Sequence, residues 1–177
     1  MLAKKTVGLF ATGAATTKPW RLMLAGVFVA SAFGLIALRV AWGTPPTPGL
    51  FTSTPIVGPV VFEPINTKSE TDDHIDIKTR DLCDVYVTQI TIKPGGNGGW
   101  HSHPGPSIIT VKSGTATFYD DCVDFARQQF TAGTGFVEDA GCVHLLANEG
   151  NVDLEVVVVQ IVPFGMPRRI DEPAPAP

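Results

Sequence analysis

The sequence has little cysteine and contains no Cys-x-x-Cys pair. Its 177 residues include three cysteines, Cys83, Cys122 and Cys142, so at most one internal disulfide can form and one thiol is left over. The absence of Cys-x-x-Cys excludes the commonest structural zinc and redox motifs. Cys83 and Cys122 each lie beside aspartates, in stretches that we expect to be exposed. We therefore predict that these two residues form a bridge in an oxidising compartment.

Acidic residues are absent from residues 1–43, a stretch that contains five of the 13 Lys and Arg. Within it, Leu22 to Leu38 is an uncharged apolar run of 17 residues, followed by a small-x-small site at Ala41 to Gly43. These are the parts of a secretory signal peptide, but a run of this length also reaches the lower limit for a transmembrane helix. We predict a cleaved signal peptide or a signal-anchor helix, with the N-terminus in the cytoplasm and the folded part extracytoplasmic.

Basic residues are scarce in the remainder of the chain. Residues 44–177 carry eight Lys and Arg against all 17 Asp and Glu. Phosphates repel a segment this acidic, which excludes nucleic acid and an anionic membrane surface as its partners. We expect a small molecule, a cation or another protein instead. The membrane is contacted only through residues 1–43, if that segment is not cleaved.

Apolar residues with the 3.6-residue period of a helix are absent from residue 56 onward. Residues 44–55 are rich in proline and threonine, and we interpret them as a linker. Short β-branched or alternating stretches follow over residues 56–165, and they predict an all-β sandwich or barrel. We expect the Pro-rich tail, residues 166–177, to lie over the barrel or to be disordered at its end. The strands are predicted at 60–65, 74–79, 84–92, 108–112, 115–120, 123–130, 135–139, 143–148 and 154–163.

Three of the four histidines have the spacing of a metal site. His101 and His103 project to one side of an extended strand because alternate residues share a face. His144 lies in a separate strand-like stretch, and three imidazoles from two segments can hold a divalent metal while leaving positions for water or substrate. Trp100 adjoins the pair and is a candidate for stacking on a substrate. His74 has no such context, and we interpret it as a surface residue.

The spacing of these residues resembles the two motifs of the cupin superfamily. The first, G(X)5HXH(X)3-4E(X)6G, is matched with one change by Gly95, His101, His103, Ser107 and Gly114. The second, G(X)5PXG(X)2H(X)3N, is matched with one change by Gly133, Asp139, Gly141, His144 and Asn148. The resemblance is to small single-domain cupins of bacteria, including exported actinobacterial ones. It implies a double-stranded β-helix, or jelly-roll barrel, preceded here by an N-terminal hydrophobic helix, and it implies a homodimer paired through edge strands.

The two departures from these motifs concern a ligand and a turn. Ser107 stands where the family has its glutamate ligand, so we expect a three-histidine site without a protein anion. In the superfamily such a site is similar to that of cysteine-type thiol dioxygenases and of some diketone-cleaving enzymes, which use non-heme iron. Fe(II) is therefore favoured, with Zn, Mn, Ni or Cu as alternatives. Asp139 replaces a proline in a turn, and Glu138 and Asp139 could reach the mouth of the barrel.

Three functions stay open. The first is a metal-dependent oxidoreductase resembling dioxygenases, for which we identify no catalytic base. The second is a non-catalytic module that binds a small molecule or a metal, and the third is a barrel with a vestigial metal site that serves in protein interaction. Trp100, Ser107 and Cys142 are the candidate substrate-binding residues. Cys142 lies two residues before His144, where it is either a small buried hydrophobe or a fourth, soft ligand.

Overall fold

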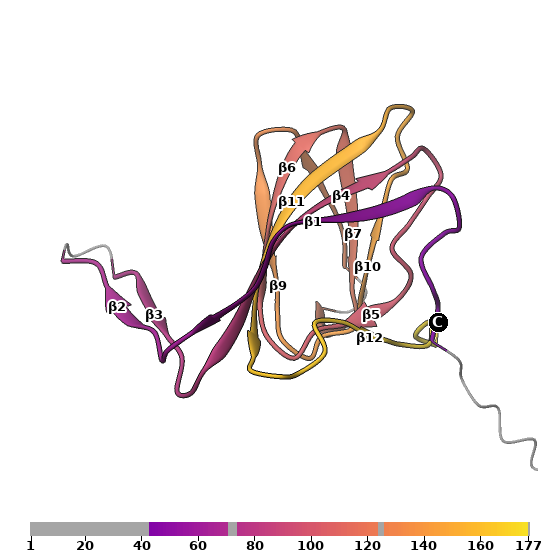
Figure 1. Cartoon of the computed structure of the whole chain (residues 1–177). Helices are drawn as coiled ribbons and strands as arrows, with labels where there is room; N and C mark the ends of the chain where they lie inside the picture. Colours follow the sequence, from indigo (N-terminus) through magenta and orange to yellow (C-terminus); the bar gives the residue numbers. More distant parts are fainter. Residues whose placement is uncertain (1–42, 71–73, 124–125, 177) are drawn as a thin grey trace, which may run out of the picture. The chain divides into compact units, whose positions relative to one another are not determined.

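The computed structural model of the chain describes residues 43–70, 74–123 and 126–176. These residues form twelve β-strands and one 3-10 turn, η1 (Asp121–Val123). Figure 1 shows how the strands are arranged. The predicted all-β fold is confirmed. The predicted N-terminal hydrophobic helix falls on residues 1–42, outside the described residues. Within the described ranges, no helix has the length and apolar character that crossing a membrane would require.

The larger sheet is built around a long central strand. Its strands pair antiparallel in the order β1-β4-β11-β6-β9. β11 is buried at every second residue, which is the pattern of a strand with one face against a core. The five strands are β1 (Phe51–Phe62), β4 (Cys83–Ile92), β11 (Leu154–Pro163), β6 (Ser107–Ser113) and β9 (Gly135–Glu138).

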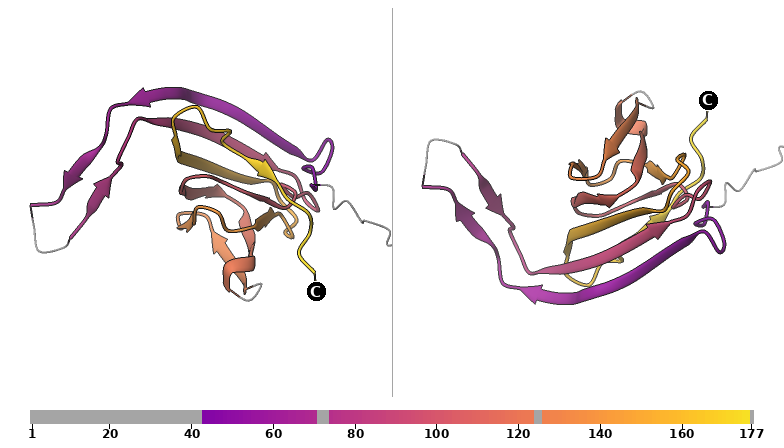
Figure 2. Two further views of the ribbon diagram at one scale, coloured as in Figure 1. Left: turned by 90° about the horizontal axis from the view of Figure 1, so that it is seen from below. Right: turned by 90° about the horizontal axis from the view of Figure 1, so that it is seen from above.

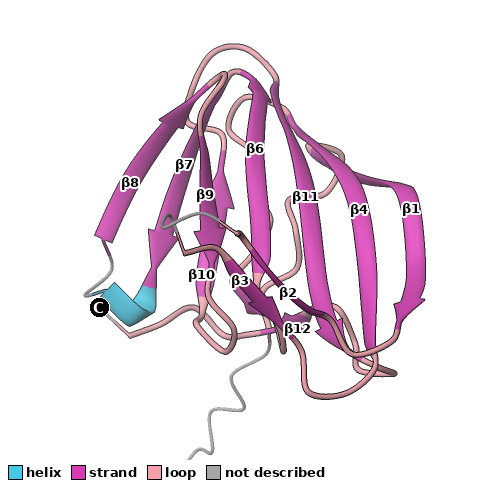
Figure 3. Cartoon of the chain, turned by 90° about the vertical axis from the view of Figure 1, so that its left-hand side faces the viewer, coloured by secondary structure: helices cyan, strands magenta, loops and turns pink. Residues whose placement is uncertain are grey.

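A second sheet of shorter strands faces the first, and Figure 3 shows both. Its order is β12-β5-β10-β7-β8. The core between the sheets combines β-branched and leucine side chains of both, among them Val156 of the first sheet and Leu146 of the second. This is the two-layer arrangement expected of a jelly roll. The five strands are β12 (Ile170–Asp171), β5 (His101–Ser102), β10 (His144–Ala147), β7 (Thr115–Asp120) and β8 (Ala126–Thr131).

The first strand begins inside the segment that we interpreted as a linker. β1 starts at Phe51 and pairs with β4 from that residue on, so residues 51–55 belong to the barrel. Pro55 and Pro59 are tolerated because β1 pairs only with β4 and is the edge of its sheet, where a proline removes no ladder hydrogen bond. A proline-rich stretch can therefore be either a linker or an edge strand, and the sequence alone does not distinguish the two.

A two-stranded hairpin extends away from the other strands, as both views in Figure 2 show. It consists of β2 (Asn66–Lys68) and β3 (Asp76–Lys78), which pair only with each other. Apolar side chains of the hairpin region and of the adjoining half of β1 are exposed: Ile56, Val57, Val60, Val61, Phe62, Ile75 and Ile77.

Residues 164–172 follow the last long strand and return to the second sheet. We call them the closing segment. Its strand β12 pairs with β5, so that Asp171 lies opposite His101, and Figure 1 shows the two strands side by side. Glu172 accepts a hydrogen bond from the backbone N–H of Thr44 at 2.9 Å and donates one to the carbonyl of Trp100 at 3.0 Å. The closing segment is therefore tied to the second sheet by backbone pairing.

Candidate metal centre

The three predicted histidines meet inside the barrel. β5 pairs with β10 so that His101 lies opposite His144, and His103 follows two residues after His101. The ring centroids lie 4.5 to 5.0 Å apart, and one nitrogen of each ring lies within 4.8 Å of the others. All three side chains are buried, His144 completely. The structure thus brings together the residues that the two motifs singled out.

Each ring is held at its Nδ1 atom by a backbone carbonyl. The distances are 2.8 Å from His101 to Gly99, 2.6 Å from His103 to Arg168 and 2.9 Å from His144 to Cys142. A carbonyl oxygen can only accept, so Nδ1 carries the hydrogen in each neutral ring. The free lone pair is then on Nε2, and such a second hydrogen bond is what fixes a metal-binding histidine in position.

Gly99 is the residue that allows one of these anchors. Its φ of +69° is in the left-handed region, and a Cβ atom there would lie 2.1 Å from the carbonyl oxygen of Thr44. A side chain would therefore force the backbone of residues 99 and 44 apart. The glycine both turns the chain before His101 and lets the segment after residue 43 pack against the site.

Glu138 brings a carboxylate to the same centre. It is 4% exposed, and its Oε2 atom lies 3.2 Å from His103 Nε2 and 3.5 Å from His144 Nε2. Burial alone would raise the pKa of this carboxyl, but hydrogen bonds from ring N–H groups of His103 and His144 outweigh burial and hold the pKa well below its usual value. A cation in place of those hydrogens would act in the same direction. Glu138 is therefore an anion. The expectation of a site without a protein anion is wrong.

The position of Glu138 explains the serine in the first motif. Ser107 and Glu138 are direct partners in the β6–β9 ladder, so their side chains lie on the same face. Ser107 is completely buried, and its hydroxyl accepts a hydrogen bond from Gln160 Nε2 at 3.2 Å. A small residue at 107 leaves room for the carboxylate from the neighbouring strand. The sequence signal was the alternation in β9, which places Glu138 on the same face as Phe136.

Burial keeps His101 in the form that binds metal. Its pKa is lowered to about 2, first by removal of the ring from water and then by the neighbouring His144 and Arg169. A histidine ligates only when neutral. His101 therefore stays neutral at pH values where an unperturbed histidine, with a pKa of about 6.5, takes up a proton.

The donor set of this centre fits a divalent cation. With the hydrogens of the neutral rings on Nδ1, the Nε2 atoms of His103 and His144 cannot donate to the carboxylate oxygen beside them, and a bound cation would supply the positive charge between these acceptors instead. Among the described residues, His144 Nε2 is a buried side-chain atom without a hydrogen-bond partner, a situation that costs about 1–3 kcal/mol. A metal ion bound by the three Nε2 atoms, with Glu138 beside it, would satisfy all these groups at once.

A small cavity of about 80 Å³ opens beside the centre. His101, His103 and Glu138 line it, together with two arginines of the closing segment. Its other walls are mostly apolar. They are formed by Pro46, Phe51, Ile90, Ile109, Leu146 and Val158, and the remaining polar lining residues are Ser53, Thr88 and Gln160.

None of the three candidate substrate-binding residues lines this cavity. Ser107 lies on β6, directly opposite Glu138 of β9, and is not among the residues that line the cavity. Trp100 precedes His101 and faces the other side of the strand, where its ring lies 6.4 Å from that of Tyr119 in a separate surface pocket. Cys142 is bonded to another cysteine and is therefore no soft metal ligand.

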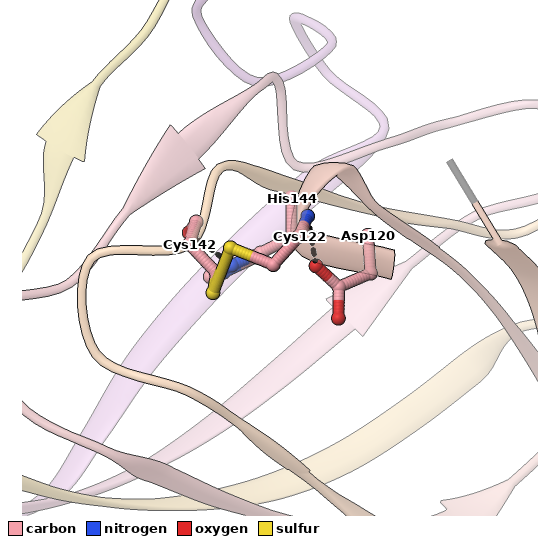
Figure 4. Close-up of a disulfide and its surroundings, with 4 residues drawn as sticks. All are labelled: Asp120, Cys122, Cys142 and His144. Atoms are coloured by element: carbon pink, nitrogen blue, oxygen red, sulfur yellow. Dashed lines mark hydrogen bonds between the residues drawn. A yellow bond between two sulfur atoms is a disulfide. The ribbon is translucent and has the colours of Figure 1, made fainter. Parts of the chain in front are cut away.

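The disulfide joins Cys122 to Cys142, as Figure 4 shows. The predicted bridge between Cys83 and Cys122 is wrong, because Cys83 is a buried, free thiol at the start of β4 in the other sheet. Cys122 and Cys142 meet because they adjoin β7 and β10, which are neighbours in the second sheet. The bridge fixes the turn before His144, including the carbonyl of Cys142 that holds its ring.

Removing the bridge should weaken both the fold and the centre. For the double variant Cys122→Ser, Cys142→Ser we expect the free energy of unfolding to fall by about 3 kcal/mol, as for a loop of 20 residues. Metal affinity should fall up to tenfold because the carbonyl anchor of His144 becomes less ordered. Denaturant titration and metal competition would measure these changes, and Cys83→Ala serves as the control that keeps the bridge. Peptide mapping that links Cys83 to Cys122 would contradict the pairing.

Comparison with known proteins places this geometry in a family. Residues 88–160, which include all three histidines and Glu138, match the family model of the cupin domain. None of the curated proteins matches the chain.

Solved structures resemble the chain at low sequence identity. A conserved protein of unknown function from Streptococcus pyogenes is 19% identical, with a TM-score of 0.45 over 66% of this chain and 78% of the other. A cupin-like protein from Thermotoga maritima is 16% identical, with a TM-score of 0.45 over 52% and 77%. An oxalate oxidase is 24% identical, with a TM-score of 0.40 over 45% and 46%. The match to the family model identifies residues 88–160 as a cupin domain.

Proposed function

We propose that this chain is an extracytoplasmic metal-binding cupin in which His101, His103 and His144 hold a divalent cation, with Glu138 as a fourth ligand. The observation that carries the proposal is the set of three buried rings, each anchored at Nδ1 and each directing Nε2 to one point. Three imidazoles and a carboxylate suit first-row transition metals. We take Fe(II) as the favoured ion, with Zn, Mn, Ni or Cu as alternatives.

We further infer that the site acts on a small molecule as a dioxygenase-like oxidoreductase. A bound metal of this kind supplies Lewis-acid or oxygen chemistry. The chain's own contribution is to hold the ligand rings rigidly, to exclude bulk water through the apolar walls, and to restrict access to molecules of small size. The cavity of about 80 Å³, lined by His101 and His103, supports a substrate of few atoms.

A non-catalytic binding module is the second candidate, and one observation favours it. Among the residues that line the cavity, Glu138 is the only carboxylate, and it is engaged by His103 and His144. A general base has to reach a substrate proton, and Glu138 is committed to the metal centre. Binding of a ligand without turnover needs no such group.

The location and the oligomeric state are part of the proposal. The basic and apolar residues 1–43 support export or anchoring at the membrane, and the Cys122–Cys142 bridge is compatible with an oxidising compartment. A homodimer would cover the exposed apolar residues around the β2–β3 hairpin, which include Val61 and Phe62. Both stay predictions.

Metal binding should depend on the three buried histidines and not on His74, the fourth histidine of the chain. We expect about one equivalent of metal per wild-type chain by elemental analysis, and at least a tenfold loss of affinity in His101→Ala and in His144→Ala, since each removes an inner ligand. His74→Ala is the matched control, because His74 is exposed and outside the centre. Metal content that is indifferent to both inner substitutions would overturn the proposal.

The carboxylate should be transferable between the two paired strands. Glu138→Ser removes the anion, and we expect metal affinity to fall at least tenfold. The double variant Ser107→Glu, Glu138→Ser places the carboxylate at the partner position of the same ladder and should restore part of the loss. Competition with a chromogenic chelator measures both. Equal affinity of wild type and Glu138→Ser would show that the carboxylate is no ligand.

Turnover separates the two candidate functions. For the iron-loaded protein we expect oxygen consumption with at least one member of a panel of thiols, diketones and phenolic compounds, and none after His144→Ala. An oxygen electrode measures it. Ligand-induced stabilisation without oxygen uptake for every member of the panel would instead identify the binding module.

A further inference from the structure

Arg168 of the closing segment places a cation inside the cavity beside the proposed metal. Its guanidinium donates from Nη1 to Thr88 Oγ1 at 2.7 Å and from Nη2 to Ser53 Oγ at 3.0 Å. Both hydroxyls line the cavity, as does Arg168 itself. The backbone carbonyl of Arg168 accepts the Nδ1 hydrogen of His103 at 2.6 Å. One residue therefore holds a ring of the centre with its backbone and directs a charged side chain at the same space.

The charge of Arg168 is not matched by an anion of the protein. No carboxylate of the described residues lies within 4.0 Å of its guanidinium nitrogens. Arg169, which also lines the cavity, differs because its Nε atom lies 2.6 Å from an oxygen of Asp171. Glu138 is paired with the histidines on the metal side. With a divalent ion present, the cavity therefore keeps a net positive charge.

The partly buried guanidinium of Arg168 donates side-chain hydrogen bonds only to neutral hydroxyls, and its carbon lies 5.9 Å from the centroid of the Tyr86 ring. It therefore retains N–H groups for a ligand. Arginine offers five donors in a planar fork, which matches the two oxygens of a carboxylate. Ser53 and Thr88 accept from Arg168, so their own hydroxyl hydrogens stay available for a second contact. The two hydroxyls therefore fix the orientation of the guanidinium before an anion binds to it.

The size and the walls of the cavity restrict the kind of anion. A volume of about 80 Å³ holds roughly six water-sized groups, which favours a ligand smaller than a nucleotide or a sugar. The apolar walls, among them Phe51, Ile90 and Leu146, suit a ligand with an apolar part. Phosphate or sulfate would expose oxygens to these walls without hydrogen-bond partners, which is costly.

We propose that the cavity binds a small organic carboxylate whose carboxylate group is held by Arg168, with Ser53 and Thr88 fixing the guanidinium. This inference rests on the proposed function, and it names the substrate class of the same site. The carboxylate provides the negative charge that the protein does not place there, and its short apolar part lies against the walls. Arg168 is a binding residue. The planar arrangement of its guanidinium N–H groups matches the two oxygens of a carboxylate and gives the site its specificity for that anion.

The experiment compares propionate with its neutral isostere propionamide on the full chain, in metal-free and zinc-loaded form, by calorimetry. We expect propionate to bind at least tenfold more tightly than propionamide, because the amide gives up a charge-assisted hydrogen bond. Arg168→Gln should weaken propionate at least tenfold and leave propionamide within twofold, and Arg168→Lys should give an intermediate loss. Arg127→Gln, which removes an exposed arginine paired with Glu149, should change neither.

Each other outcome has a distinct meaning. Unchanged propionate affinity in a folded, metal-binding Arg168→Gln protein overturns the inference and leaves the metal site standing. Tighter binding of inorganic phosphate than of propionate overturns the organic class. If the Arg168→Gln protein is unfolded and shows no cooperative thermal transition, the test rests on the wild-type protein alone. Equal affinity of the wild-type protein for propionate and propionamide then overturns the inference. Arg168-dependent binding in a protein that holds no metal supports the anion site and overturns the proposed function.

Discussion

The antiparallel pairing of β5 with β10 is the interaction on which the centre depends. It sets His101 opposite His144, and the two residues come from segments that are separated by a long stretch of chain. β5 has only two residues, so it is held from both sides, by β10 and by β12. A slip of one residue in either ladder would turn a histidine out of the barrel. The register of this short strand therefore decides whether a metal site exists at all.

The carboxylate of the centre illustrates how a site is defined by space and not by position in a motif. In the first motif the acidic residue lies on the same segment as the His-x-His pair, whereas here it lies on β9, directly across the ladder from Ser107. The two positions face the same interior and differ by about one strand spacing, roughly 5 Å. A residue-by-residue comparison of this sequence with the motif therefore indicates that the carboxylate ligand is lost. The fold retains a carboxylate beside the same rings.

Apart from β1, the longer strands and the three histidines of the centre could be predicted from the sequence because their signals are local. β7 and β11 have the predicted bounds, 115–120 and 154–163, since β-branched and aromatic residues are frequent in them and turn residues precede each strand. β5 and β12, with two residues each, are too short to carry a period.

The errors have the same origin, because they depend on which strands become neighbours. The start of β1 at Phe51 was hidden by prolines that only an edge strand tolerates. The bridge of Cys122 with Cys142 follows from the adjacency of β7 and β10. The contact of Glu138 with the centre follows from the pairing of β6 with β9.

The hydrogen bonds between Thr44 and Glu172 have a consequence for the order of assembly. They join residues that are 128 positions apart, and both partners also contact Trp100, next to the first histidine. Long-range contacts of this kind form late in folding, after the local pairs. The barrel can therefore collapse around its core before the cavity is enclosed. A chain whose closing segment, residues 164–172, is not yet in place would possess the core but not the finished pocket.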